Sequence, residues 1–208
     1  MPRGLLSLAI FAVLATGLTS QAAGPPIIKS GFQLLYETRF AQARSRFLDW
    51  EKAKPQDPLG YAWEAASYLF EEFYQQGVLS SQFFLDDKRL ARGVDGKPNG
   101  ESRAAFLVAS GTAERLAKER LTKDPKDANA LLALAVINGM LADYASLIDK
   151  RPLESLKRIR ESEGYARSLL GVKPDSGDAY LALGAANYII GSLPVHKAVP
   201  STAWWCPG

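Results

Sequence analysis

Carboxylates placed side by side are the residues of this chain that could do chemistry, because one can act as a general acid while its neighbour acts as a base or nucleophile. Such pairs occur at three places: Glu71/Glu72, Asp86/Asp87 and Glu161/Glu163. Neighbouring residues of a helix point about 100° apart, so Glu71 and Glu72 cannot converge on one small site by themselves. We therefore predict that these acidic side chains are solvated surface groups.

The residues that other common active sites need are scarce. The chain has a single cysteine, Cys206, and a single histidine, His196. This inventory excludes an internal disulfide, a Cys/His zinc site and a conventional Cys–His or Ser–His catalytic pair. Residues 95–100 lack the acidic spacing of a calcium loop, and no glycine pattern fits a phosphate or dinucleotide loop. We expect a protein that is not an enzyme and that holds no cofactor or metal.

Composition and charge bound the class of protein. Of the 208 residues, 47% are apolar and 23% are charged, which is typical of a globular chain and argues against wholesale disorder. Lysine and arginine total 25 against 22 acidic residues, a formal charge of +3. This excess is too small, and too evenly spread, for a dedicated nucleic-acid binder.

The N-terminus has the features of an export signal. Arg3 precedes an apolar run over residues 5–18, and Ser20-Gln21-Ala22 fits the small-x-small cleavage rule. The run would span ~21 Å as a helix, which is shorter than the ~30 Å hydrocarbon core of a bilayer. We predict a signal peptide over residues 1–22, a periplasmic or secreted location and no membrane span in the mature chain. The alternative is a buried or anchoring N-terminal helix.

Helical periodicity dominates the rest of the chain, and no stretch alternates as a half-buried strand would. Apolar spacing predicts helices that begin near residues 40, 59, 101, 127, 153 and 176. Short connections make sequential helices antiparallel. We therefore predict an all-α fold, a short solenoid of about seven helices stacked as antiparallel pairs. One long insertion, residues 78–100, interrupts it and is either related to a ligand or simply tolerated.

Three of these helices follow a proline at matching offsets. The tenth residue after the proline is small each time: Ala65 after Pro55, Ala135 after Pro125 and Gly184 after Pro174. We expect a close helix crossing at each. The preceding helices carry pairs at equal distances from the prolines: Ala43/Phe47, Ala113/Ala117 and Ser162/Ala166. Over residues 27–194 the pattern resembles the tetratricopeptide repeat (TPR) family, although the prolines are further apart than the family's ~34 residues.

The TPR resemblance implies that the first helix of each pair lines a concave surface on which ligands bind. It places there Leu59, Ala62, Ala66, Leu69 and Phe70; Asn129, Leu132, Val136, Gly139 and Met140; and Asp178, Leu181, Ala185, Tyr188 and Ile189. Neither lysine nor arginine stands among them, so the charged C-terminal tail of a partner is a poor candidate for the ligand. In the alternative arrangement, the 78–100 insertion folds in and fills this surface as core.

These features favour a non-enzymatic TPR-like scaffold for protein–protein interaction in the cell envelope. An alternative is a solute-binding accessory protein for a small apolar solute. The chain is somewhat similar to the TPR-like lipoproteins that accompany TRAP-type transporters, but it lacks the cysteine of their lipid anchor. A further alternative is a helical module of an envelope hydrolase whose catalytic part is absent.

Residues 195–208 do not continue the repeat. Pro200 and Pro207 leave too little room for a helix, and no period of 3.6 residues is visible. We expect this tail to be irregular, and we infer that the sequence is truncated or out of frame after about Leu193. The last helix should then expose an apolar face and drive self-association.

Overall fold

The computed structural model describes residues 26–192, and all regular secondary structure in that range is helical. Seven helices of 11 to 24 residues follow in order: α1 (Pro26–Tyr36), α2 (Phe40–Ala53), α3 (Pro58–Gln75), α6 (Gly100–Lys123), α7 (Ala128–Asp143), α8 (Pro152–Val172) and α9 (Gly177–Ser192). The predicted all-α fold is confirmed over this range. The predicted signal peptide (1–22) and tail (195–208) lie outside the described residues.

The prolines of the sequence repeat occupy the same place in three equivalent turns. In each turn a backbone N–H donates to the carbonyl three residues earlier: Asp57 to Lys54 at 3.0 Å, Asp127 to Asp124 at 3.1 Å and Ser176 to Lys173 at 3.1 Å. Proline is the second residue each time, where its fixed φ suits a tight turn. The closing residue then caps the next helix: the Asp57 side chain accepts from the Leu59 N–H, and the Asp127 side chain accepts from the Ala130 N–H.

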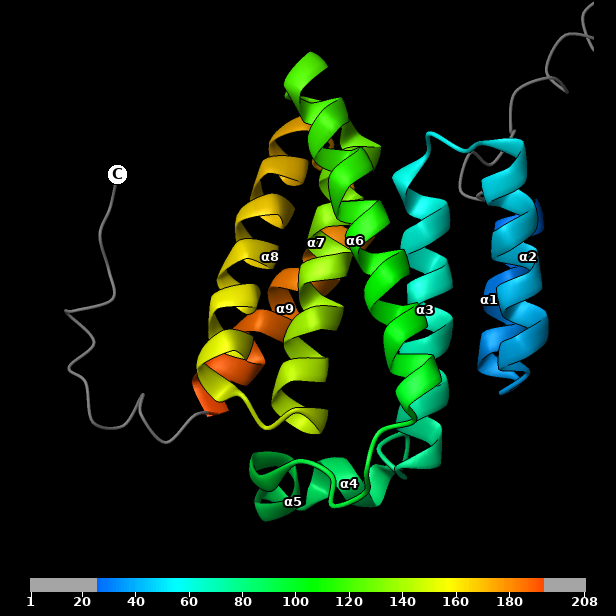
Figure 1. The fold of residues 1–208 in the computed structure, drawn as a ribbon. Coiled ribbons are helices and arrows are strands. Elements are labelled where there is room, and N and C mark those ends of the chain that lie inside the picture. Colours follow the sequence, from blue (N-terminus) through cyan, green and yellow to red (C-terminus); the bar gives the residue numbers. More distant parts are fainter. Residues whose placement is uncertain (1–25, 193–208) are drawn as a thin grey trace, which may run out of the picture.

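The long helices pack as pairs stacked in sequence order (Figure 1). Within pairs, α1 contacts α2, α3 contacts α6, and α7 contacts α8. Between pairs, α2 contacts α3, α6 contacts α7, and α8 contacts α9. The first helices of successive pairs also contact each other, α3 with α7 and α7 with α9. Short turns between antiparallel neighbours produce this arrangement, and they place the starts of α3, α7 and α9 along one edge.

The expected close crossings exist in two of the three repeats. Ala65 and Ala135 are buried, and the Ser162 hydroxyl of α8 donates a 2.7 Å hydrogen bond to the Ala135 carbonyl of α7. Gly184 of α9 is exposed instead, and a Cβ added there meets nothing within 4 Å. The predicted crossing at Gly184 is therefore wrong for the described part of the chain, because none of its helices packs against that side of α9.

The insertion contains two short helices, α4 (Ser81–Leu85) and α5 (Asp87–Arg92), which lie beneath the ends of α3 and α7 in Figure 1. Its buried side chains, Val78, Phe83 and Val94, belong to one apolar cluster with four of the predicted concave residues: Ala62, Ala66, Leu69 and Met140. The Val94 N–H also donates to the Leu147 carbonyl at 2.9 Å, within the π-helical turn η1 (Tyr144–Ile148) that follows α7. The insertion therefore completes the core at this end of the bundle.

The adjacent glutamates of α3 are not the solvated pair that the sequence predicts. Glu72 is only 2% exposed, and its carboxylate accepts hydrogen bonds from Gln76 Nε2 at 2.9 Å and from the Asn99 backbone N–H at 3.2 Å. Asn99 in turn caps α6. Glu71 is half-buried and pairs with Arg44 of α2. The prediction fails because the chain that leaves the insertion folds back over Glu72.

The stretch Ala128–Ile148, which joins α7 to η1, is long and apolar enough to cross a membrane. In the structure 67% of its most apolar window is buried inside the bundle. Its neighbours are α3, α6, α8 and α9, so its apolar character supplies core contacts on several sides.

Candidate binding groove

A groove of about 930 Å³ runs along the edge where α3, α7 and α9 begin. Its other walls are α1 and the C-terminal end of α2. The residues that line it are Ile28, Lys29, Phe32, Gln33, Tyr36, Glu37, Trp50, Lys54, Asp57, Leu59, Trp63, Asn129 and Asp178. The equivalent proline turns bring the helix starts to this edge, and α1 closes the groove from the side.

Aromatic side chains form the floor of the groove. The ring of Phe32 meets that of Trp63 edge to face, with centroids 4.9 Å apart, and meets that of Phe47 at 5.7 Å. Trp50 is fixed by its indole N–H, which donates to Asp57 Oδ2 at 3.1 Å. Because Asp57 also caps α3, the same carboxylate orders the helix start and the tryptophan. The floor is preformed, as is usual for a binding groove.

Charged and polar side chains of both signs form the rim. Lys54 Nζ lies 4.5 Å above the Trp50 ring, in cation–π contact, and it pairs with no carboxylate among the described residues. The exposed side chains of Lys29, Asn129 and Asp178 likewise make no hydrogen bond or ion pair within the described range. These four side chains are available to a ligand. The groove can thus hold an apolar body on its floor and polar groups at its rim.

The predicted concave residues fall into groups with different surroundings. Leu59, Asn129 and Asp178 line the groove. Ala62, Ala66, Leu69 and Met140 are core residues, whereas Leu132, Val136 and Gly139 are half-buried, and Phe70, Leu181 and Ala185 are exposed outside the groove. The side chains of Tyr188 and Ile189 lie outside what the structure describes. The insertion therefore fills the concave surface at one end, and the surface stays open at the helix starts.

The sequence interpretation missed the lysines and most of the aromatic residues of the groove. The TPR resemblance places the surface on the helices after the three prolines and leaves out α1 and the end of α2. Those two elements contribute Lys29 and Lys54, so the inference that the groove lacks cations is wrong. A signal was present in the sequence, since Ile28, Phe32 and Tyr36 recur every four residues and mark one face of a helix.

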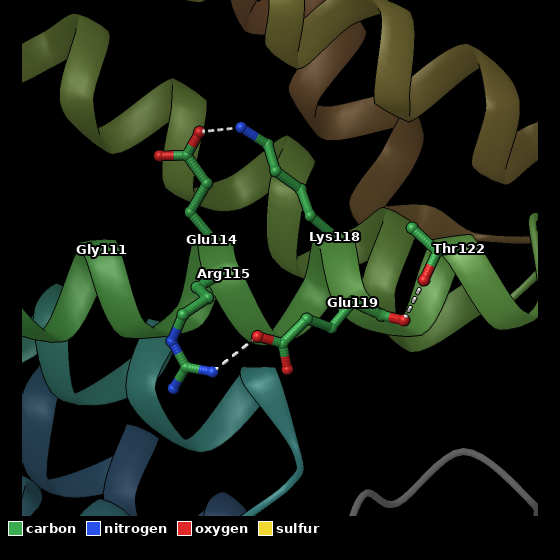
Figure 2. Close-up of a pocket in the computed structure, with 6 residues that line it drawn as sticks. All are labelled: Gly111, Glu114, Arg115, Lys118, Glu119 and Thr122. Atoms are coloured by element: carbon green, nitrogen blue, oxygen red, sulfur yellow. Dashed lines mark hydrogen bonds and ion pairs between the residues drawn. The ribbon is translucent and has the colours of Figure 1, made fainter.

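A second hollow, of about 460 Å³, lies along α6 alone (Figure 2). The charged side chains there pair four residues apart along the helix: Lys118 with Glu114 at 2.6 Å and Arg115 with Glu119 at 2.8 Å. The Thr122 hydroxyl donates to the Glu119 carbonyl. Such pairs are typical of a solvent-facing helix. Among the described residues, no group of three or more His, Cys, Asp or Glu side chains could hold a metal ion.

No family model, curated protein or solved structure matches this chain.

Proposed function

We propose that this protein is an exported, non-enzymatic TPR-like scaffold whose groove binds a segment of a partner protein. The observation that carries the proposal is an open groove with an aromatic floor at the starts of three equivalent helices. The stacked helix pairs and the repeated proline turns support it, because helical-repeat arrays bind ligands on the side formed by their first helices. The N-terminal apolar run supports export.

The composition of the groove favours a polypeptide with apolar side chains. Trp50, Trp63 and Phe32 offer rigid apolar contact area at small entropic cost, which is typical of interface hot spots. The rim offers Lys29 and Asp178, charges of opposite sign that can pair with backbone or side-chain groups of a bound segment. A polar rim around an apolar centre is the usual anatomy of a protein interface.

Capture from an envelope extract with matched variants tests the groove. Tyr36 is 85% exposed and lines the groove, whereas Tyr180 of α9 is 58% exposed and does not. We expect Tyr36→Ala to weaken capture of the partner about tenfold, the usual scale of an interface aromatic, and Tyr180→Ala to leave it unchanged. Equal capture by both variants would show that the groove is not the binding surface.

N-terminal sequencing of the protein recovered from the envelope tests export. The Ser20-Gln21-Ala22 site predicts a mature chain that begins at Ala23. Retention of Met1 would contradict cleavage and favour an anchored protein.

The groove volume also favours a second candidate, the solute-binding accessory protein. About 930 Å³ lies within the ~300–1,000 Å³ typical of small-molecule sites. Native mass spectrometry of the purified protein distinguishes the two candidates. A small apolar molecule that leaves on mild activation, and is lost in Tyr36→Ala, supports the solute, whereas a bound polypeptide supports the scaffold.

A further inference from the structure

Two acidic side chains face each other in the interface between α2 and α3. Glu51 of α2 is buried, with 8% of its surface exposed, and Glu64 of α3 is half-buried. The backbones approach closely here, because a Cβ placed on Gly60 would lie 2.8 Å from Glu51 Cγ and 3.0 Å from Trp50 Cδ1. Because Gly60 has no side chain, nothing separates the two helices at this point, and Glu51 packs directly on the backbone of α3.

Glu64 lies one helical turn after Gly60, on the face of α3 that meets Glu51, so the two carboxyl groups are neighbours, and a hydrogen bond between their side chains is among the causes that shift the pKa of each. A carboxylate has no proton to donate, so this hydrogen bond exists only while one of the two groups is protonated. In addition, Glu51 Oε1 is buried and finds no donor among the described residues. An ionised Glu51 would therefore be both desolvated and next to a like charge.

The surrounding charges offset the burial of the pair only in part. Arg44 of α2 lowers the pKa of Glu64, and no cation of the described residues acts on Glu51. Tyr61 and Tyr68 of α3 lie beside the pair, and they in turn interact with Arg115 of α6 and Glu71 of α3. Arg44 is engaged elsewhere, since its guanidinium bonds Ser67 and Glu71 and lies 3.8 Å above the Tyr68 ring. Arg115 is paired with Glu119 on the outer side of α6. Glu51 consequently has no cation of its own.

We propose that Glu51 and Glu64 form a proton-binding clamp that holds α2 against α3 while one carboxyl is protonated and loosens when both are ionised. The clamp extends to the groove, because Trp50 precedes Glu51 in α2, packs on Gly60 and lines the groove floor. Loss of the shared proton therefore shifts the groove wall. The clamp does not depend on which ligand the groove binds.

The clamp titrates near neutral pH. Burial, followed by the charge of Glu64, raises the pKa of Glu51 from 4.5 to about 7. Burial also raises the pKa of Glu64. A folded-state pKa above the unfolded value means that the native state binds the proton more tightly, so the stabilisation is greatest at low pH and is lost as the pH rises to about 7.

Fluorine NMR of the full-length chain labelled with fluorotryptophan detects the clamp directly, with the Trp50 resonance assigned by Trp50→Phe. In the wild type we expect this resonance to shift between pH 5 and pH 9 with a midpoint near 7. In Glu51→Gln the amide can donate to Glu64 at every pH, so the resonance should stay at its low-pH position. Glu64→Gln should behave in the same way.

Urea unfolding gives an independent measurement that does not rely on the probe. Between pH 5 and pH 8 the unfolding constant of the wild type should rise on the order of 100-fold relative to that of Glu51→Gln. Asp143→Asn is the matched control, because burial raises the pKa of Asp143 to about 7 as well, on α7, which packs chiefly against α8, α6 and α3 rather than α2. A Trp50 transition that survives in both glutamine variants, or that disappears only in Asp143→Asn, overturns the proposal.

Discussion

Replacing Gly31 by alanine tests whether α1 is docked as the outer wall of the groove. Gly31 is buried at the centre of α1, where the helix crosses α2. A Cβ placed on it would overlap Phe47 Cε1 and would lie 2.9 Å from Phe47 Cζ. Phe47 is fully buried and also contacts Phe32, so its ring has no free space to enter.

Two opposing effects set the size of the change. Alanine gains about 1 kcal/mol over glycine in a helix interior, whereas overpacking a well-filled core costs about 1–3 kcal/mol. Gly111 supplies the matched control, since it lies within α6, is exposed and has nothing within 4 Å of an added Cβ. Gly111→Ala should therefore gain stability, and Gly31→Ala should be less stable than Gly111→Ala by about 1–3 kcal/mol.

Urea unfolding followed by circular dichroism at one pH measures both variants. Adding Phe47→Leu to Gly31→Ala should recover part of the loss, with a coupling of at least about 0.5 kcal/mol, because the two residues touch. Equal gains from Gly31→Ala and Gly111→Ala, without coupling to Phe47, would falsify the docking of α1 and remove one wall of the groove.

Four further substitutions test the fold around the groove. Ala135→Leu should lower the free energy of unfolding by about 1–3 kcal/mol, whereas Gly184→Leu in open space should change it by less than about 0.5 kcal/mol; melting temperatures distinguish the two. Because the insertion is part of the core, Phe83→Ala should lower the free energy of unfolding, measured with urea, by about 3–5 kcal/mol. A much smaller loss would show that the insertion is a loosely packed loop. Glu72→Ala removes the acceptor of the Asn99 N–H, so it should lower the free energy of unfolding by about 1–3 kcal/mol in the same measurement.

The helix boundaries were predictable because their signals are local. Proline fixes φ in the turn, and the aspartate or serine two residues later caps the next helix, so the turns at residues 54–57, 124–127 and 173–176 can be recognised from four residues each. The pairing of the helices follows from short connections. Neither inference needs contacts between distant parts of the chain.

The groove was only partly predictable because its walls come from separate helices. Leu59, Asn129 and Asp178 follow from their offsets after the prolines. Lys54 ends the second helix of a pair, a position that the family comparison does not place on the concave side, yet its side chain reaches Trp50 at the groove. Which residues of α1 face inward depends on how α1 packs against α2 and α3.

Buried acidic residues are the hardest feature to recognise from sequence, because their type suggests solvent exposure. Glu72 is covered by the chain at Asn99, 27 residues away, and no residue near Glu72 in the sequence indicates that contact. The burial of Glu51 differs, because a glycine elsewhere in the sequence is consistent with it. Gly60 stands in the first turn of α3, where it costs helix stability relative to alanine, and a glycine retained there is consistent with close backbone approach. The same close approach places the buried carboxyl of Glu51 next to that of Glu64, beside the groove.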